Sequence, residues 1–223
     1  QSPLKRAGLD WETLHEKYPK LVYGYVSGYG EKGPDKDLPG FDFTAFYARG
    51  GILGPLRDKN SLPMLTVQGF GDHQVAMNLA AGVLAALFKA KMTGEGDHVV
   101  VSLFHSAIWD ISLMLQASQY GADSTQYPME RWKLGNPLVL CYETADGQWL
   151  QIAMPQYDRH YPILMNAMGY PELADDARYY PQKNLIPNRE EFSAWITAEF
   201  KKKTCDEWCK LLDANDLPYA IAQ

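Results

Sequence analysis

The strongest local constraint in this 223-residue chain is an acid that follows two glycines and precedes a long apolar-periodic run. Asp72 comes directly after Gly69-Phe70-Gly71, and apolar residues recur at helical spacing across 74–92, which predicts a helix beginning beside the acid. The free amides and the positive dipole end of a helix start favour a negative charge there. A carboxylate held in this way can act as a nucleophile, and an ordinary N-cap aspartate gives the same pattern.

The composition is that of a globular chain, with 46% hydrophobic and 22% charged residues and a net charge of −6. The acidic balance gives no broad basic surface, so nucleic acid is not an expected partner. Charged residues interrupt every apolar run, so we expect no membrane span and no membrane partner. The histidines show no metal-ligand spacing. Cys205 and Cys209 share a helix face and could bind a metal, but no histidine lies near them, so they are interpreted as small buried hydrophobes and no metal is expected. With Cys141 they make an odd set without paired spacing, which indicates a reducing, cytoplasmic compartment.

The chain is predicted to contain an α/β part followed by an α+β part. In the first part we expect helices over 4–18, 41–49 and 104–120 besides the one after Asp72, and strands over 21–27 and 98–103. In the second part, 138–143 and 148–154 flank Asp146-Gly147, a strong hairpin signal, and helices are expected at about 157–168, 189–203 and 205–215. Thr204 and Glu207 fit a capping box for the last helix. Both ends of the chain look cut, which indicates a fragment of a longer protein.

Two further segments are candidates for ligand contacts. The loop after the first strand contains Gly28, Gly30 and Gly33, whose missing side chains allow close approach of a ligand, although a plain surface loop has the same composition. The segment Trp132-Lys133-Leu134-Gly135-Asn136-Pro137 leads into the hairpin and suits either a lid over the acid or an ordinary domain linker.

The order and spacing of several short runs resemble the class III CoA-transferases, the family of formyl-CoA and carnitine CoA-transferases. The matching runs are Leu21-Val22-Tyr23, Ser27-Gly28-Tyr29-Gly30, Gly33-Pro34, Pro39-Gly40-Phe41-Asp42, Gly71-Asp72, Ala85-Ala86-Leu87-Phe88, Thr93-Gly94-Glu95-Gly96-Asp97-His98-Val99 and Thr144-Ala145-Asp146-Gly147-Gln148-Trp149. No single run is specific, but their order over essentially the whole chain is.

The resemblance implies that this chain is the central part of a class III CoA-transferase of α/β class. Residues 1–124 would then be a portion of the large domain carrying the acid. Residues 125–223 would be the small α+β domain, with a short antiparallel sheet, and the start of the return to the large domain. Chains of the family are about twice this length, with an α/β half before this region, and they form interlocked homodimers.

The resemblance also assigns roles to individual residues. The family's catalytic acid falls on Asp72, which would attack an acyl-CoA thioester to give a mixed anhydride and then an aspartyl-CoA thioester, from which CoA passes to an acceptor acid. CoA would be a co-substrate, with no permanently bound cofactor, and the partners would be an acyl-CoA and a small carboxylic acid. The expected CoA contacts are Ser27, Gly28, Tyr29 and Gly30, and the expected substrate or lid residues are Phe41, Gly135 and Asn136. The glycine-rich lid of many members is not matched here.

Within the family, the runs 46–51 and 127–138 look most like transferases for 2-hydroxy acids such as phenyllactate and 2-hydroxyisocaproate, which serve amino-acid fermentation. A 2-methylacyl-CoA racemase of the same fold is the first alternative, but it needs two bases, and the racemases have a histidine where this chain has Phe41. The second alternative is a non-catalytic CoA-binding or assembly module, in which Asp72 is only a helix cap.

Overall fold

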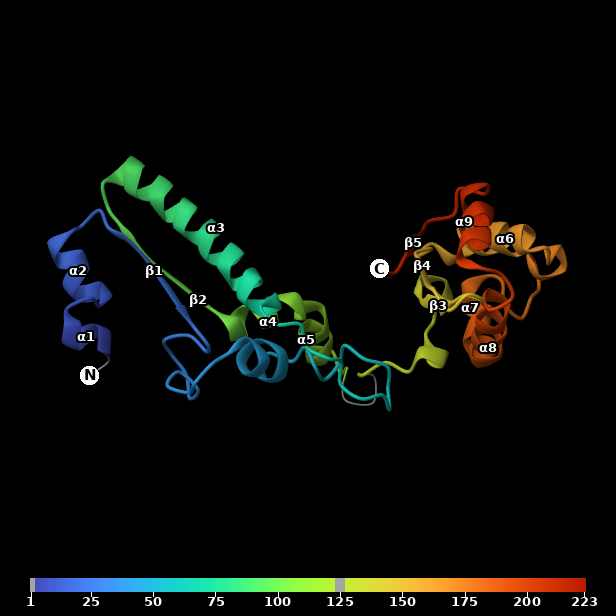
Figure 1. The fold of residues 1–223 in the computed structure, drawn as a ribbon, viewed down its shortest axis with the longest axis horizontal. Helices are drawn as coiled ribbons and strands as arrows, with labels where there is room; N and C mark the ends of the chain where they lie inside the picture. The colour runs from blue at the N-terminus through green and yellow to red at the C-terminus, as the bar shows by residue number, and fades with distance from the viewer. Residues whose placement is uncertain (1–2, 123–126) are drawn as a thin grey trace. The chain divides into compact units, whose positions relative to one another are not determined.

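The computed structural model describes residues 3–122 and 127–223 of the chain, as drawn in Figure 1. Contacts divide the chain into two compact units, Gln1–Pro128 and Met129–Gln223. The first contains a two-stranded sheet and the second a three-stranded sheet. Helices combined with parallel and antiparallel strands confirm the predicted α/β class. The assignment of residues 1–124 and 125–223 to a large and a small domain stays a prediction.

The first unit is built on two parallel strands covered by one long helix (Figure 1). Its elements are α1 (Pro3–Ala7), α2 (Trp11–Lys17), β1 (Val22–Ser27), the π-helix η1 (Asp42–Arg49), α3 (Phe70–Thr93), β2 (Asp97–Ser102), α4 (Leu103–Asp110) and α5 (Ser112–Gln119). The strands pair in register from Val22 opposite Asp97 to Ser27 opposite Ser102. Helix α3 packs closely because Gly24 presents no side chain toward Leu79.

Three predicted helices of this unit were wrong in their extent. The helix expected over 4–18 is two helices, because Gly8 has a φ of 65° and Asp10 starts α2 by accepting the Thr13 N–H at 3.2 Å. The helix expected over 104–120 breaks at Ile111, which ends α4 with a φ of −98° and a ψ of 16°. Helix α3 begins at Phe70, earlier than the apolar periodicity indicates, because its first turn contains no periodic apolar residue.

Helix α3 is also long and apolar enough to cross a membrane by length and composition, so the expectation that no stretch reaches a span was wrong. Its charged residues Asp72, Lys89 and Lys91 lie near the two ends and leave an uninterrupted uncharged stretch between them. Only 11% of its most apolar window is buried. This criterion does not assign a membrane location, because core helices of other proteins also meet it. Large apolar side chains such as Leu84 and Phe88 are exposed along α3.

The second unit combines a small antiparallel sheet with helices. Its elements are η2 (Arg131–Lys133), η3 (Pro137–Val139), β3 (Cys141–Glu143), β4 (Trp149–Ile152), α6 (Tyr157–Met168), η4 (Pro171–Leu173), α7 (Gln182–Leu185), η5 (Ile186–Asn188), α8 (Arg189–Phe200), α9 (Cys205–Asp213) and β5 (Tyr219–Ile221). The predicted hairpin is confirmed, since β3 pairs antiparallel with β4 and β5 adds to the other edge of β4. The capping box of Thr204 and Glu207 is confirmed as well.

The core of the second unit is rich in aromatic side chains. Tyr142 of β3 stacks on Phe200 of α8, with ring centroids 4.6 Å apart and planes within 7°. Trp208 of α9 is fully buried against the same ring and donates its indole N–H to the Phe200 carbonyl at 2.8 Å. The polar atom of the buried indole is therefore satisfied, so its large apolar surface stabilises the unit without a desolvation cost.

We expect Trp208→Ala to lower the free energy of unfolding of the second unit by about 3–5 kcal/mol, because it leaves a large cavity and an unpaired carbonyl. The measurement is urea unfolding followed by circular dichroism. Trp149→Ala is the matched control, since Trp149 is 45% exposed, and its effect should stay within about 1 kcal/mol. Equal losses in the two variants would contradict the assignment of Trp208 to the core.

Candidate active site

The candidate nucleophile Asp72 is the third residue of α3, and the N-cap of this helix is Gly69, with a φ of 81°. The interpretation of Asp72 as an ordinary N-cap was therefore wrong. Its side chain is exposed, and within 3–122 and 127–223 it accepts no hydrogen bond and forms no ion pair. A carboxylate at the positive end of a helix dipole with no protein partner is free to meet a substrate.

The amides of the first turn of α3 are mostly occupied. The Phe70 N–H donates to the Val67 carbonyl at 3.3 Å, and the His73 N–H donates to the Gly69 carbonyl at 2.9 Å. The Gly71 N–H donates to Asp42 Oδ1 at 3.0 Å. Among the described residues, only the N–H of Asp72 itself is left without a partner in this turn. The free amides expected at this helix start are thus reduced to a single donor in the described structure.

Gly71 is a glycine because its surroundings have no room for a side chain. It is buried, and an ideal Cβ at this position would lie 2.7 Å from the Phe46 Cβ and would overlap the Phe46 ring and Asp42 Oδ1. Phe46 is fully buried and belongs to η1, so the helix that carries the acid sits directly on the π-helix. Short π-helical segments are rare and occur often at functional sites.

The predicted CoA loop is held by close backbone packing. Ser27 Oγ accepts the Gly30 N–H at 2.8 Å, and Tyr29 is buried in the core of the first unit. Gly28 lies against Gly40, since a Cβ on Gly28 would be 2.5 Å from the Gly40 Cα. The absence of a side chain at Gly28 therefore allows its backbone to contact that of Gly40. The participation of these four loop residues in CoA binding stays a prediction.

These contacts bring several predicted residues of the first unit together. The loop touches Gly40, the chain then passes through Phe41 to Asp42, and Asp42 bonds the residue before Asp72. The Phe41 side chain is 67% exposed, and its own N–H is bound by Thr44 Oγ1 at 3.0 Å. The glycine loop, Phe41 and the acid thus form one contiguous set, although they come from three separate segments of the sequence.

Gly135 and Asn136 belong to the second unit and are held by hydrogen bonds within it. Asn136 donates to the Met154 carbonyl at 3.1 Å and accepts the Leu138 N–H at 2.9 Å. The Gly135 carbonyl accepts a hydrogen bond from the Gln182 side chain at 3.0 Å. These bonds fix the local backbone that was expected to be a mobile link, and a role of this segment as a lid stays a prediction.

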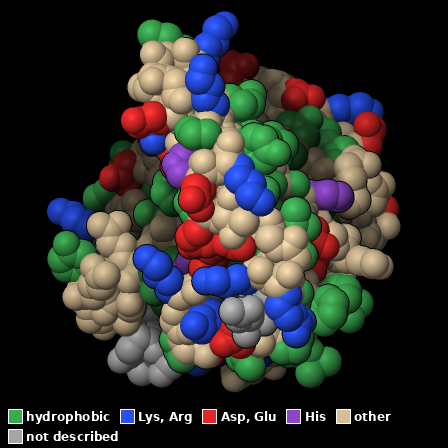
Figure 2. Space-filling model, turned by 90° about the vertical axis from the view of Figure 1, so that its left-hand side faces the viewer, with side chains coloured by type: hydrophobic (Ala, Val, Ile, Leu, Met, Phe, Trp, Pro, Cys, Tyr) green, Lys and Arg blue, Asp and Glu red, His purple; other side chains and the backbone are tan. Residues whose placement is uncertain are grey.

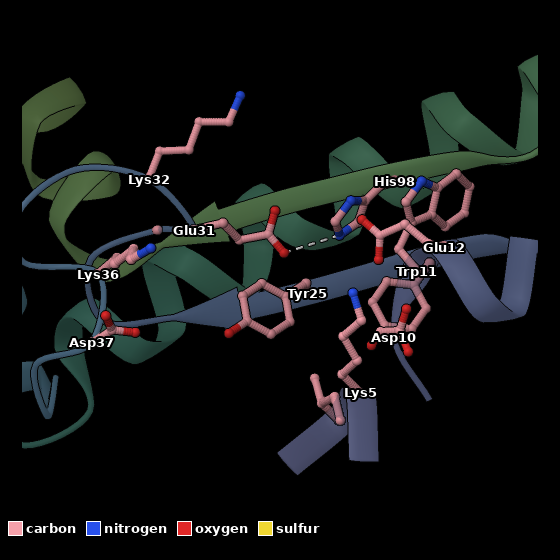
Figure 3. Close-up of a pocket in the computed structure, with 13 residues that line it drawn as sticks. Lys5, Asp10, Trp11, Glu12, Tyr25, Glu31, Lys32, Lys36, Asp37 and His98 are labelled. Carbon is pink, nitrogen blue, oxygen red and sulfur yellow. Dashed lines mark ion pairs between the residues drawn. The ribbon is translucent and has the colours of Figure 1, made fainter. Parts of the chain in front are cut away.

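A pocket of about 440 Å³ near α2, shown in Figure 3, was missed by the sequence analysis. Trp11 stacks between His15 and His98, with centroid distances of 4.2 and 5.3 Å. Glu31 lies 3.4 Å from His98 Nε2, an ion-pair distance, but without hydrogen-bond geometry. Gly30 also lines the pocket, so it borders the predicted CoA loop. Its residues come from distant segments with no shared motif, so no local signal could have found it.

The rim of this pocket carries charges of both signs. Lysine and acidic side chains lie next to one another on this end of the first unit, as Figure 2 shows. The charged lining residues are Lys5, Asp10, Glu12, Glu31, Lys32, Lys36 and Asp37. A mixed rim of this kind selects no ligand by net charge, so we keep Asp72 as the candidate for chemistry.

The described residues give little support for a cysteine nucleophile or for a metal site. Cys205 is buried, and burial together with the neighbouring Cys209 raises the pKa of its thiol to about 11. The thiol is therefore neutral near pH 7 and a poor nucleophile. Within the described part of the chain, no group of three or more His, Cys, Asp or Glu side chains is arranged to hold a metal ion.

Comparison with known proteins decides the family. The model of CoA-transferase family III matches residues 1–223. The chain belongs to CoA-transferase family III. It is 49% identical over 99% of its length to the cinnamoyl-CoA:phenyllactate CoA-transferase of Clostridium sporogenes, and 38% identical over 99% to the (R)-2-hydroxy-4-methylpentanoate CoA-transferase of Clostridioides difficile. It covers 54% of each of these relatives, so the chain spans about half the length of the curated relatives it matches.

A solved structure supports the same assignment at the level of the fold. The crystal structure of Rv3272 from Mycobacterium tuberculosis matches with a TM-score of 0.81 and 26% identity, over 99% of this chain and 56% of that chain. This family III chain therefore shares its fold with about half of that protein. This agrees with the expected α/β fold of a part of a class III CoA-transferase, and the central position of that part stays a prediction.

We expect Gly71→Ala to destabilise the first unit by about 1–3 kcal/mol, because the added methyl group overpacks the contact between α3 and η1. Thermal and urea unfolding measure the change. Gly54→Ala is the control, because a Cβ at Gly54 meets nothing within 4 Å. A Gly71→Ala protein as stable as the Gly54→Ala protein would show that the two elements are not packed as described.

Proposed function

We propose that this chain supplies the nucleophile of an enzyme that transfers CoA from an acyl-CoA to a 2-hydroxy acid. The observation that carries the proposal is the exposed carboxylate of Asp72, without a partner among the described residues, at the start of α3. Two other helices of this unit have an acid in the first turn, which is Glu12 in α2 and Asp42 in η1, and the Asp42 carboxyl is buried and engaged with the Gly71 N–H. Membership of CoA-transferase family III supports the reaction class.

In the proposed reaction, an Asp72 oxygen attacks the thioester carbonyl of the donor acyl-CoA, and the C–S bond breaks to release the CoA thiolate and leave a mixed anhydride. The thiolate then attacks the aspartyl carbonyl, which releases the donor as a free carboxylate and forms an aspartyl-CoA thioester. The acceptor carboxylate attacks this thioester, the thiolate leaves again, and its attack on the acceptor carbonyl frees Asp72. Each step exchanges one bond to an acyl carbon, so no oxidant or metal is required.

Two features of the site suit this chemistry. The Asp72 carboxylate stands at the positive end of the α3 dipole, and the Asp72 N–H, which has no partner among the described residues, is a donor for a developing oxyanion. An anhydride must also be kept from water. The exposed apolar side chains of α3 give a surface on which further chain can exclude water, in keeping with a homodimer of longer chains.

The acceptor class is proposed from the relatives. The two curated relatives named above are a phenyllactate and a 2-hydroxy-4-methylpentanoate CoA-transferase by name, and both substrates carry a hydroxyl next to the carboxyl and an apolar side chain. A racemase is less well supported, because Phe41 carries no group that could take a proton from the substrate. The other alternative is a non-catalytic binding or assembly module, and a direct test of Asp72 distinguishes it from a transferase.

We expect full-length protein incubated with an acyl-CoA and quenched with hydroxylamine to carry a hydroxamate on Asp72, because the proposed anhydride and thioester intermediates both carry an activated aspartyl carbonyl. Peptide mass spectrometry locates the modification. Asp72→Asn should lower kcat by more than about 10³-fold, the scale on which removal of a nucleophile acts. Its unfolding midpoint should not change, because the Asp72 side chain has no partner in the described structure.

Glu95→Gln is the matched control, since Glu95 is an exposed acid just beyond the other end of α3, and it should keep full activity and give the same Asp72 adduct. An unmodified Asp72 in protein that binds CoA would overturn the transferase proposal in favour of a binding module.

A further inference from the structure

Asp42 is a buried acid that the proposed reaction does not use. It is the first residue of η1 and only 5% of its surface is exposed. We propose that Asp42 is the positioning residue of Asp72: its carboxyl group fixes the backbone at the start of α3 and so determines where the nucleophile stands. The inference rests on the proposed function, because it concerns the same carboxylate.

The link between the two acids is one buried hydrogen bond. Asp42 Oδ1 accepts the N–H of Gly71 at 3.0 Å across a sequence separation of 29 residues. Gly71 is the second residue of α3, so its N–H has no carbonyl within the helix to bind. Because the bond is buried, water cannot replace Asp42, and its loss leaves an unsatisfied donor inside the protein.

The place of Asp72 depends on this backbone contact. The Asp72 side chain has no partner of its own among the described residues, and the glycines at 69 and 71 provide no side chain to pack against it. Phe46 and the Asp42 carboxyl both crowd the side of Gly71 where a Cβ would stand. The backbone at Gly71 is thus packed against the Phe46 ring and bonded to the Asp42 carboxyl, and Asp72 follows as the next residue.

The second oxygen of Asp42 indicates that stability alone does not account for this acid. Asp42 Oδ2 is buried and has no hydrogen-bond partner in the described part of the protein. Buried polar atoms are nearly always satisfied, and exceptions call for a functional reason. A residue that only filled space at this position would not bring an unsatisfied oxygen into the core. In this proposal, the function of Asp42 in fixing Gly71, the residue before the nucleophile, outweighs the free-energy cost of its buried, unsatisfied oxygen.

The test compares three variants of the full-length protein. Asp42→Ala should lower kcat, and the rate of hydroxamate formation on Asp72, by about 10²-fold, the scale on which a displacement of about 1 Å acts. The KM for the acyl-CoA should stay unchanged, because Asp42 contacts no substrate in this proposal. Asp42→Asn should keep most of the activity, since its amide oxygen can accept the same bond. Asp35→Ala removes an acid paired with Arg49 at the surface and should match the wild type.

Hydrogen exchange gives a second, independent measurement. The Gly71 amide should exchange slowly in the wild type and in Asp42→Asn and faster in Asp42→Ala, while peptides of β1 and β2 should not change. If Asp42→Ala does not fold, Asp42→Ser takes its place, because a hydroxyl one bond shorter does not reach Gly71.

Wild-type kcat in Asp42→Ala, an equal loss in Asp42→Asn, or a change confined to KM would each overturn the positioning role while leaving the Asp72 adduct intact. Absence of any Asp72 adduct in the wild type would instead overturn the proposed function, and this inference with it.

Discussion

The buried hydrogen bond between the Asp42 carboxyl and the Gly71 amide joins the two segments on which the candidate site depends. One segment leads from the glycine loop into η1, and the other starts α3. Packing of α3 on β1 and β2 then fixes this start relative to the sheet. Most contacts along this route involve backbone atoms or missing side chains, so the site is defined by how closely main chains approach rather than by a cluster of polar groups.

This construction explains which features the sequence predicted and which it did not. The hairpin around Asp146-Gly147 and the capping box of Thr204 depend on neighbouring residues, and local rules found both. Asp72 was found for the same reason. The alternative that it is the N-cap was wrong, because the sequence gives no sign that Gly69 adopts the left-handed conformation and takes the cap position. The pairing of Asp42 with Gly71 spans 29 residues and has no local pattern, so it could not have been predicted from one sequence.

The composition of helix α3 fits more than one environment. Its central stretch is uncharged, which is the signature both of a membrane span and of a helix buried on several sides. Residues such as Leu84 and Phe88 are exposed here, and the chain spans about half the length of its curated relatives. Apolar surface of this extent is favourable only when it is covered. In the proposed homodimer of longer chains, this surface would be covered.

The contact between Gly28 and Gly40 is reciprocal: each glycine occupies the space that a side chain on the other would need. Substitution at most packed positions can be offset by a smaller residue opposite. Here neither partner can become smaller, so no compensating change exists at the contact itself. The two positions are therefore expected to vary little and without covariation, and methods that detect contacts from correlated substitutions would overlook the very contact that brings the glycine loop to the candidate active site.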